Sequence, residues 1–107
     1  MLDLNGLREL LLRIDPGLTQ YVATGKSGAY TVWSPLGLTT QMAEDSPDDV
    51  FQRVQIDRYE PRPDDTVVMQ IIRELDAAHV PQSDPITDHE PQDGVFRWVI
   101  TCEVRRT

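Results

Sequence analysis

The sequence predicts an α/β protein of the α+β type, with a mostly antiparallel sheet of four or five strands and two helices packed on one face. Two patterns indicate this fold class. Apolar and polar residues alternate over residues 54–57 and 96–104, as in strands that have one face on a core. Apolar residues recur at helical spacing over residues 4–18 and 68–78, which predicts two helices with one apolar stripe each.

The chain begins with the first of these helices. Its expected N-cap is Asp3 or Asn5, and the turn-forming residues 15–17 end it. The apolar stripe predicted for it consists of Leu4, Leu7, Leu11 and Ile14, with Leu18 one turn further on.

Residues 30–34 predict a strand in which Tyr30, Val32 and Ser34 face one side and Trp33 faces the other. Proline and glycine at 35 and 37 interrupt it, and residues 38–42 form either a second strand or the continuation of a long bent one. Trp33 allows two interpretations. It is a core residue of a sheet covered on both sides, or an aromatic anchor at a subunit contact.

The segment from Val50 to His79 contains the central strand and the second helix. The strand is expected to stop near Tyr59, because prolines at 61 and 63 cannot donate to a strand ladder. Asp64 or Asp65 then caps the helix, and Pro81 ends it. We expect one core made of Val54, Ile56, Val68, Ile71, Ile72, Leu75, Phe96, Trp98 and Ile100.

The C-terminal part predicts a linker over 79–85, a short strand at 86–90, a turn at 91–94 and a final strand over 96–104. In the final strand one face is apolar throughout. A slip of one residue would move two aromatic side chains into water, so the register is strongly specified.

Length, charge and cysteine content limit the possible functions. The 107 residues predict a single domain over 1–107, and the net charge of −8 argues against a nucleic acid or an anionic membrane as partner. Cys102 is the single cysteine, so no disulfide can form within the chain. The N-terminus lacks the pattern of a signal peptide, and no apolar run approaches about 20 residues, so we expect a cytoplasmic protein.

Little in the sequence indicates catalysis. His79, His89 and Cys102 are not at metal-ligand spacing, and Cys102 falls on the apolar face of the final strand. Residues 25–28 lack the spacing of a phosphate-binding loop. The acidic segment 44–49 is either a solvated turn or a divalent-metal loop, and it lacks the ligand spacing of a calcium loop. We therefore expect no enzyme activity, no cofactor and no metal.

Three segments carry a resemblance to a known family: VQIDRYEPRPDD, VVMQIIRELDAA and PQDGVFRWVITCEV, in this order after a leading helix and a strand. From about Tyr30 to Val104 the chain resembles the tail-terminator or tail-completion proteins of long-tailed bacteriophages and prophages. The resemblance implies a small α/β protein that assembles as a hexameric ring on the head-proximal end of the tail tube. Such a ring stops tube growth and presents the surface to which the filled head joins.

The partners implied by this resemblance are further copies of the chain, the tail tube protein and the head-tail connector protein. They do not include nucleic acid or a membrane. The implied location is the host cytoplasm during assembly and the virion tail afterwards. An alternative function is a small acidic bacterial protein-binding module of the immunity or adaptor type, which would meet a basic partner.

A ring requires two different contact patches on each subunit. One candidate patch combines Trp33 with Lys26 in the loop at 25–28. The other is the acidic loop, met by arginines on the neighbouring subunit. Its candidate residues are Glu44, Asp45, Asp48 and Asp49, with Arg58 and Arg62 as the arginines.

Overall fold

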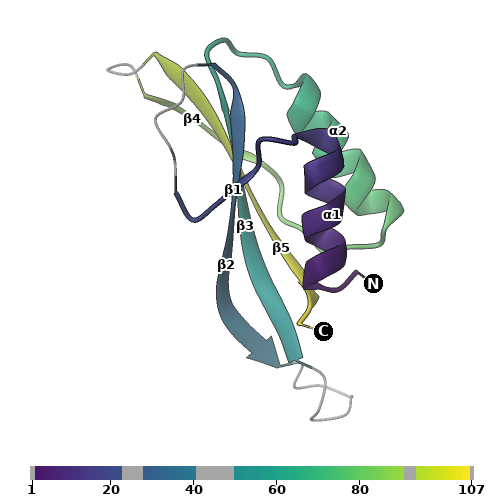
Figure 1. Cartoon of the computed structure of the whole chain (residues 1–107). Helices are drawn as coiled ribbons and strands as arrows, with labels where there is room; N and C mark the ends of the chain where they lie inside the picture. Colours follow the sequence, from purple (N-terminus) through teal and green to yellow (C-terminus); the bar gives the residue numbers. More distant parts are fainter. Residues whose placement is uncertain (1, 23–27, 41–49, 91–93, 107) are drawn as a thin grey trace.

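The computed structural model describes residues 2–22, 28–40, 50–90 and 94–106. Its elements are α1 (Leu4–Ile14), β1 (Thr19–Gln20), β2 (Tyr30–Thr40), β3 (Val50–Glu60), α2 (Thr66–Ala77), β4 (Ile86–Glu90) and β5 (Val95–Arg105). The strands form a mixed sheet in the order β1-β2-β3-β5-β4, in which only the β1–β2 pair is parallel. Both helices lie side by side on one face of the sheet (Figure 1). The predicted fold class is therefore confirmed.

The helix ends follow from local hydrogen bonding. Asp3 caps α1, because its Oδ1 accepts from the Gly6 N–H at 2.7 Å. At the start of α2, Asp64 Oδ1 accepts from both the N–H and the hydroxyl of Thr66, while Asp65 occupies the cap position without a side-chain bond. These bonds hold the pKa of Asp64 below its ordinary value.

The C-terminus of α2 is a Schellman motif, in which the Val80 N–H donates to Leu75 O and the His79 N–H donates to Asp76 O. His79 adopts a left-handed conformation with φ of 57° to allow this turn. Val80 and Leu75 are both buried in the core, so the motif also has its hydrophobic contact. The helix therefore ends through its own hydrogen bonds, before Pro81.

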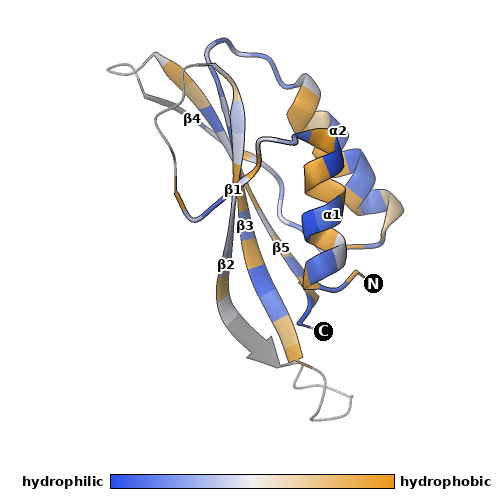
Figure 2. Ribbon diagram, in the orientation of Figure 1, coloured by the Kyte–Doolittle hydropathy of each residue, from blue (hydrophilic) through white to orange (hydrophobic). Residues whose placement is uncertain are grey.

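The core lies between the sheet and the two helices. Hydrophobic and hydrophilic residues alternate as bands along β3 (Figure 2), and its apolar side chains point to the helices. All nine predicted core residues belong to this cluster or pack against it, with Ile72 and Phe96 partly buried. The core additionally contains Leu7, Leu10, Leu11, Trp33, Val80, Cys102 and Val104.

β2 and β3 form a long hairpin that extends past the ends of the helices (Figure 1). The predicted interruption at Pro35 and Gly37 is a shift of register between Pro35 and Leu38 within one strand, not the end of a strand. At this irregularity Gln52 Nε2 donates to Leu36 O at 2.7 Å. The chain therefore has one long bent strand here, which is the second of the two arrangements that the sequence allowed.

Candidate interaction surfaces

The two faces of the sheet differ in what covers them. Trp33, Ile56 and Ile100 lie side by side in register and belong to the core under the helices. Their sequence neighbours point to the opposite face, since successive side chains of a strand alternate. We call this opposite face the outer face. It is formed by Tyr30, Val32, Ser34, Gln55, Asp57, Tyr59, Ile86, Asp88, Arg97 and Val99.

An ordered cluster of side chains occupies the outer face. The Tyr30 and Tyr59 rings stack with centroids 4.7 Å apart and planes 13° from parallel. The Arg97 guanidinium lies over the Tyr59 ring, with its Cζ 5.8 Å from the centroid. Its Nη2 also lies 3.3 Å from Asp57 Oδ2, and Gln55 Nε2 donates to the same carboxylate at 3.0 and 3.1 Å. We refer to these five residues as the outer-face cluster.

The outer-face cluster has the composition of a contact surface. Stacked aromatic rings contribute about 0.5–1.5 kcal/mol beyond their buried area, and they hold large side chains in one conformation. Tyrosine and arginine are enriched at protein interfaces, where such rigid groups lose little entropy on binding. Sequence reasoning missed the cluster, although the alternation along β3 and β5 already placed Asp57, Tyr59 and Arg97 on the polar side of their strands.

Arg58 is buried on the opposite, helix-covered face. Its Nε lies 2.8 Å from Glu60 Oε2, and its Nη1 lies 3.1 Å from Asp15 Oδ2 and 2.9 Å from Thr31 Oγ1. The whole residue is 8% exposed. These contacts engage its Nε and Nη1 within the subunit, which does not favour the expectation that Arg58 meets an acidic loop of another subunit.

Trp33 is also a core residue. It is 5% exposed and belongs to the cluster of side chains between sheet and helices. The interpretation of Trp33 as a subunit anchor is therefore replaced by the interpretation of it as core. It stands out in the sequence because Tyr30 and Val32 present large side chains on the other face of the same strand. In the structure Trp33 pairs with the core residue Ile56, so the helices cover the face of β2 on which Trp33 lies.

The remaining interface candidates fall into two groups. Arg62 lies exposed after β3 and is accessible to a partner. Lys26 and the acidic residues Glu44, Asp45, Asp48 and Asp49 lie outside the described residues.

His79 and Cys102, the histidine and cysteine whose side chains the structure describes, are not assembled into a site. Cys102 is 1% exposed, and burial raises its pKa to about 12, so its thiol is protonated near neutral pH. Exposed His79 belongs to the turn after α2. Within residues 2–22, 28–40, 50–90 and 94–106, no group of three or more His, Cys, Asp or Glu residues could hold a metal ion.

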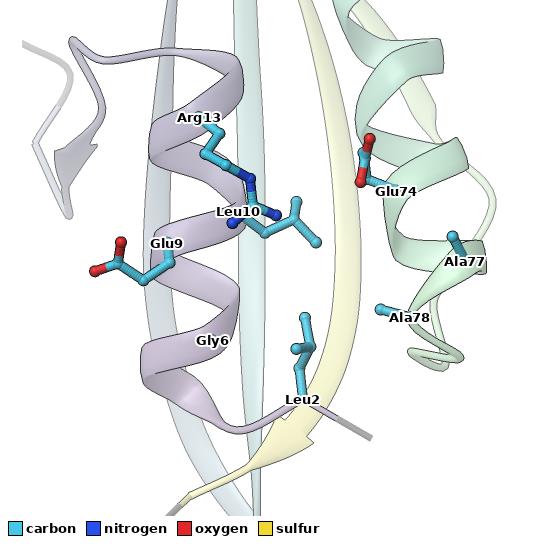
Figure 3. A pocket seen from close by; sticks show the side chains of 8 residues that line it. All are labelled: Leu2, Gly6, Glu9, Leu10, Arg13, Glu74, Ala77 and Ala78. Atoms are coloured by element: carbon cyan, nitrogen blue, oxygen red, sulfur yellow. The ribbon is translucent and has the colours of Figure 1, made fainter.

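A shallow groove of about 370 Å³ lies between the helices. Figure 3 shows Leu2 and Leu10 from the α1 side facing Glu74, Ala77 and Ala78 on the α2 side, with Arg13 above them. Its lining combines apolar side chains with charges of both signs at the rim. Such a groove suits a protein contact more than a small polar substrate, for which convergent polar groups would be needed.

No helix in the described part of the chain is long and apolar enough to cross a membrane. No protein-family model matches the chain, and no curated protein matches it either.

Proposed function

We propose that this chain is a structural virion protein of the tail-terminator type, which forms a ring on the phage tail tube and joins the tube to the head. The outer face of the sheet carries this proposal. It is not covered by either helix. Tyr30, Tyr59, Arg97 and Gln55 are partly exposed there, and they are ordered within one subunit around Asp57, which is itself 6% exposed. A surface of this kind suits a permanent contact between subunits.

The shape of the subunit adds support. The β2–β3 hairpin projects past the helical layer, and the principal extents of the molecule are 46 × 24 × 22 Å. An elongated subunit can contact one neighbour through its projecting hairpin and the next neighbour through a different surface. Such heterologous contacts form a ring when the rotation between subunits closes. The element order also agrees with the resemblance described above.

In this proposal the ring assembles in the host cytoplasm and becomes part of the virion tail. Its partners are identical subunits, most simply six, the tail tube protein on one side and the head-tail connector on the other. The outer face replaces Trp33 as the proposed apolar contact. The proposed charged residues at the rim of this subunit contact remain Arg62, Lys26 and the acidic residues at 44, 45, 48 and 49.

The test is electron microscopy of purified tail tubes mixed with the protein. The parent chain should form a ring at one end of each tube. Val99→Glu should abolish the rings, because it places a carboxylate on the outer face in register with Asp57. Met69→Glu is the matched control, since Met69 lies exposed on α2, and this variant should still form rings.

Circular dichroism and thermal melting establish that both variants are folded. Rings formed equally by Val99→Glu and Met69→Glu would rule out the outer face as the subunit contact. Tubes that bind none of the folded parent protein would overturn the terminator function.

In that case the second candidate, an acidic binding module of the immunity or adaptor type, takes its place. The net charge of −8 favours a basic protein as its partner.

A further inference from the structure

The outer edge of β5 is almost fully covered by other parts of the chain. β4 pairs with its first half. Along its second half, the Ser83 N–H donates to Thr101 O at 2.8 Å, the Glu103 N–H to Pro81 O at 3.0 Å and the Arg105 N–H to Leu2 O at 3.0 Å. The backbone groups of residues 101, 103 and 105 therefore all point to this side of the strand.

This alternation fixes the orientation of β4. The odd-numbered residues of β5 direct their backbone N–H and C=O groups toward β4. Arg97 and Val99 therefore form the hydrogen-bonded pairs with Asp88 and Ile86. The intervening residues of β4, Thr87 and His89, then direct their N–H and C=O groups away from β5. β4 is the last strand on this side among the described residues, and within them no strand pairs with these four backbone groups. We call this side of β4 its open edge.

The opposite edge of the sheet is covered along residues 32–35 of β2. β1 covers β2 at Val32 and Trp33. Beyond it, the Tyr21 N–H donates to Trp33 O at 3.0 Å, and the Tyr21 hydroxyl donates to Pro35 O at 2.9 Å. Pro35 has no N–H to offer, a common protection of edge strands. Two copies of the chain therefore cannot extend one sheet by placing β4 of one against this part of β2 of the next.

The charge around β4 indicates what its open edge can accept. The sequence between Arg73 and Arg97 contains no lysine or arginine. Asp84 and Asp88 are exposed in and just before β4. Ile86 and Asp88 both lie on the outer face, and Ile86 is 66% exposed. The nearest cation in register is Arg97, opposite Asp88, and its guanidinium contacts Asp57 and Tyr59. The edge therefore offers one apolar contact next to acidic side chains.

In one register a second copy of β4 fits this edge poorly. Antiparallel pairing of two β4 strands about a two-fold axis at Asp88 places the two Asp88 carboxylates opposite each other, and like charges in that position are destabilising. We propose that the β4 edge is a docking site for an extended, basic segment of a partner protein, which adds to the sheet as a further strand. This inference does not depend on the ring proposal.

The pleat of the sheet specifies the pattern of the bound segment. Side chains on the same face of a strand are two residues apart. An apolar side chain beside Ile86 and a lysine or arginine beside Asp88 must therefore be separated by one residue. The backbone of Thr87 and His89 supplies the hydrogen bonds, and the two outer-face contacts supply selectivity.

Titration with an end-blocked, fluorescein-labelled peptide of the sequence Val-Thr-Lys-Thr-Val-Thr-Lys, which carries valine and lysine on the same face, tests the site. Fluorescence anisotropy should show saturable binding that weakens with added salt. The amide protons of Thr87 and His89 should become protected from exchange. A peptide with the same side chains but with every amide methylated cannot pair as a strand on either edge, and it should bind at least about tenfold more weakly.

Thr87→Pro is the decisive variant of the protein. It removes an outward-facing N–H without removing a bond to β5, so the fold should be retained while the affinity falls about tenfold or more. Asp88→Asn should weaken binding about two- to fivefold. Glu9→Gln, on exposed α1, removes the same charge and should leave the affinity unchanged.

Three results would overturn the proposal. Equal binding of the methylated peptide would show attraction to charge without strand pairing. Unchanged affinity of a folded Thr87→Pro variant would place the peptide elsewhere. A dimer of the chain alone that Thr87→Pro dissociates, seen by analytical ultracentrifugation, would show that a second copy occupies the edge.

Discussion

Arg58 and Glu60, two residues apart on β3, form an ion pair on the helix-covered side of the sheet, with Nε 2.8 Å from Oε2. Both side chains are largely buried, with 10% and 9% of their surface exposed. The same guanidinium reaches Asp15, which follows the last residue of α1. The pair therefore joins the sheet to the end of the first helix, at a place where apolar side chains would otherwise be expected.

Arg58→Met should destabilise the protein by on the order of 3–5 kcal/mol, because it leaves two carboxylates near each other without their cation. Urea unfolding followed by tryptophan fluorescence measures the change. Arg62→Met, at an exposed position on the same segment, is the control and should change stability by less than about 0.5 kcal/mol. Equal unfolding midpoints for the two variants would contradict a structural role for the buried ion pair.

Periodicity predicted most of the fold because most elements bury one face. The stripe of α1 and the alternation of β5 were sufficient to assign both elements and their inward faces. The same reasoning did not find β1, because two residues have no measurable period and their parallel pairing with β2 depends on the tertiary fold.

The outer-face cluster and the burial of Trp33 could not be predicted without knowing the register between the strands. Alternation assigns residues to two faces, but it does not show which face the helices cover. A strand with aromatic side chains on both faces, as in Tyr30 and Trp33, leaves the choice open. Arg58 was assigned to the surface because of its charge, whereas its neighbours Glu60 and Thr31 make its burial possible.

Trp33→Ala should destabilise the protein by about 3–5 kcal/mol, because it leaves a cavity under the helices. A tryptophan that served only as a subunit anchor would leave the fold intact when removed. Trp98→Ala should behave similarly, since Trp98 is 7% exposed in the same core. Thermal melting measures both. Tyr21→Ala, at a position that is 60% exposed, should melt much closer to the parent.

Cys102 should resist alkylation in the folded protein. Its thiol is buried and protonated near neutral pH, while the thiolate is the reactive form. Iodoacetamide at pH 8 should leave the native chain unmodified by mass spectrometry and should modify it once urea is added. Rapid labelling without denaturant would show that β5 separates from the helices far more often than a core strand does.

The same thiol makes stability depend on alkaline pH. In the unfolded chain the thiol ionises around its ordinary pKa of 9.0, whereas in the folded chain it keeps its proton until about pH 12. The folded state thus binds the extra proton, and stability falls as pH rises above 9, by roughly 1.4 kcal/mol at pH 10. Cys102→Ala should lack this part of the decline. Parallel stability curves for parent and variant between pH 8 and 10 would contradict it.

His79→Gly should stabilise the protein. His79 occupies the left-handed position of the motif that ends α2, with φ of 57°, and a side chain with a Cβ is strained there by about 1–2 kcal/mol. Glycine relieves this strain but loses more entropy on folding, so the expected gain is about 0.5–1 kcal/mol. His79→Val should destabilise the protein, because a β-branched side chain fits this conformation worst. Urea unfolding of the pair measures the difference, and a less stable glycine variant would show that the imidazole makes a compensating contact.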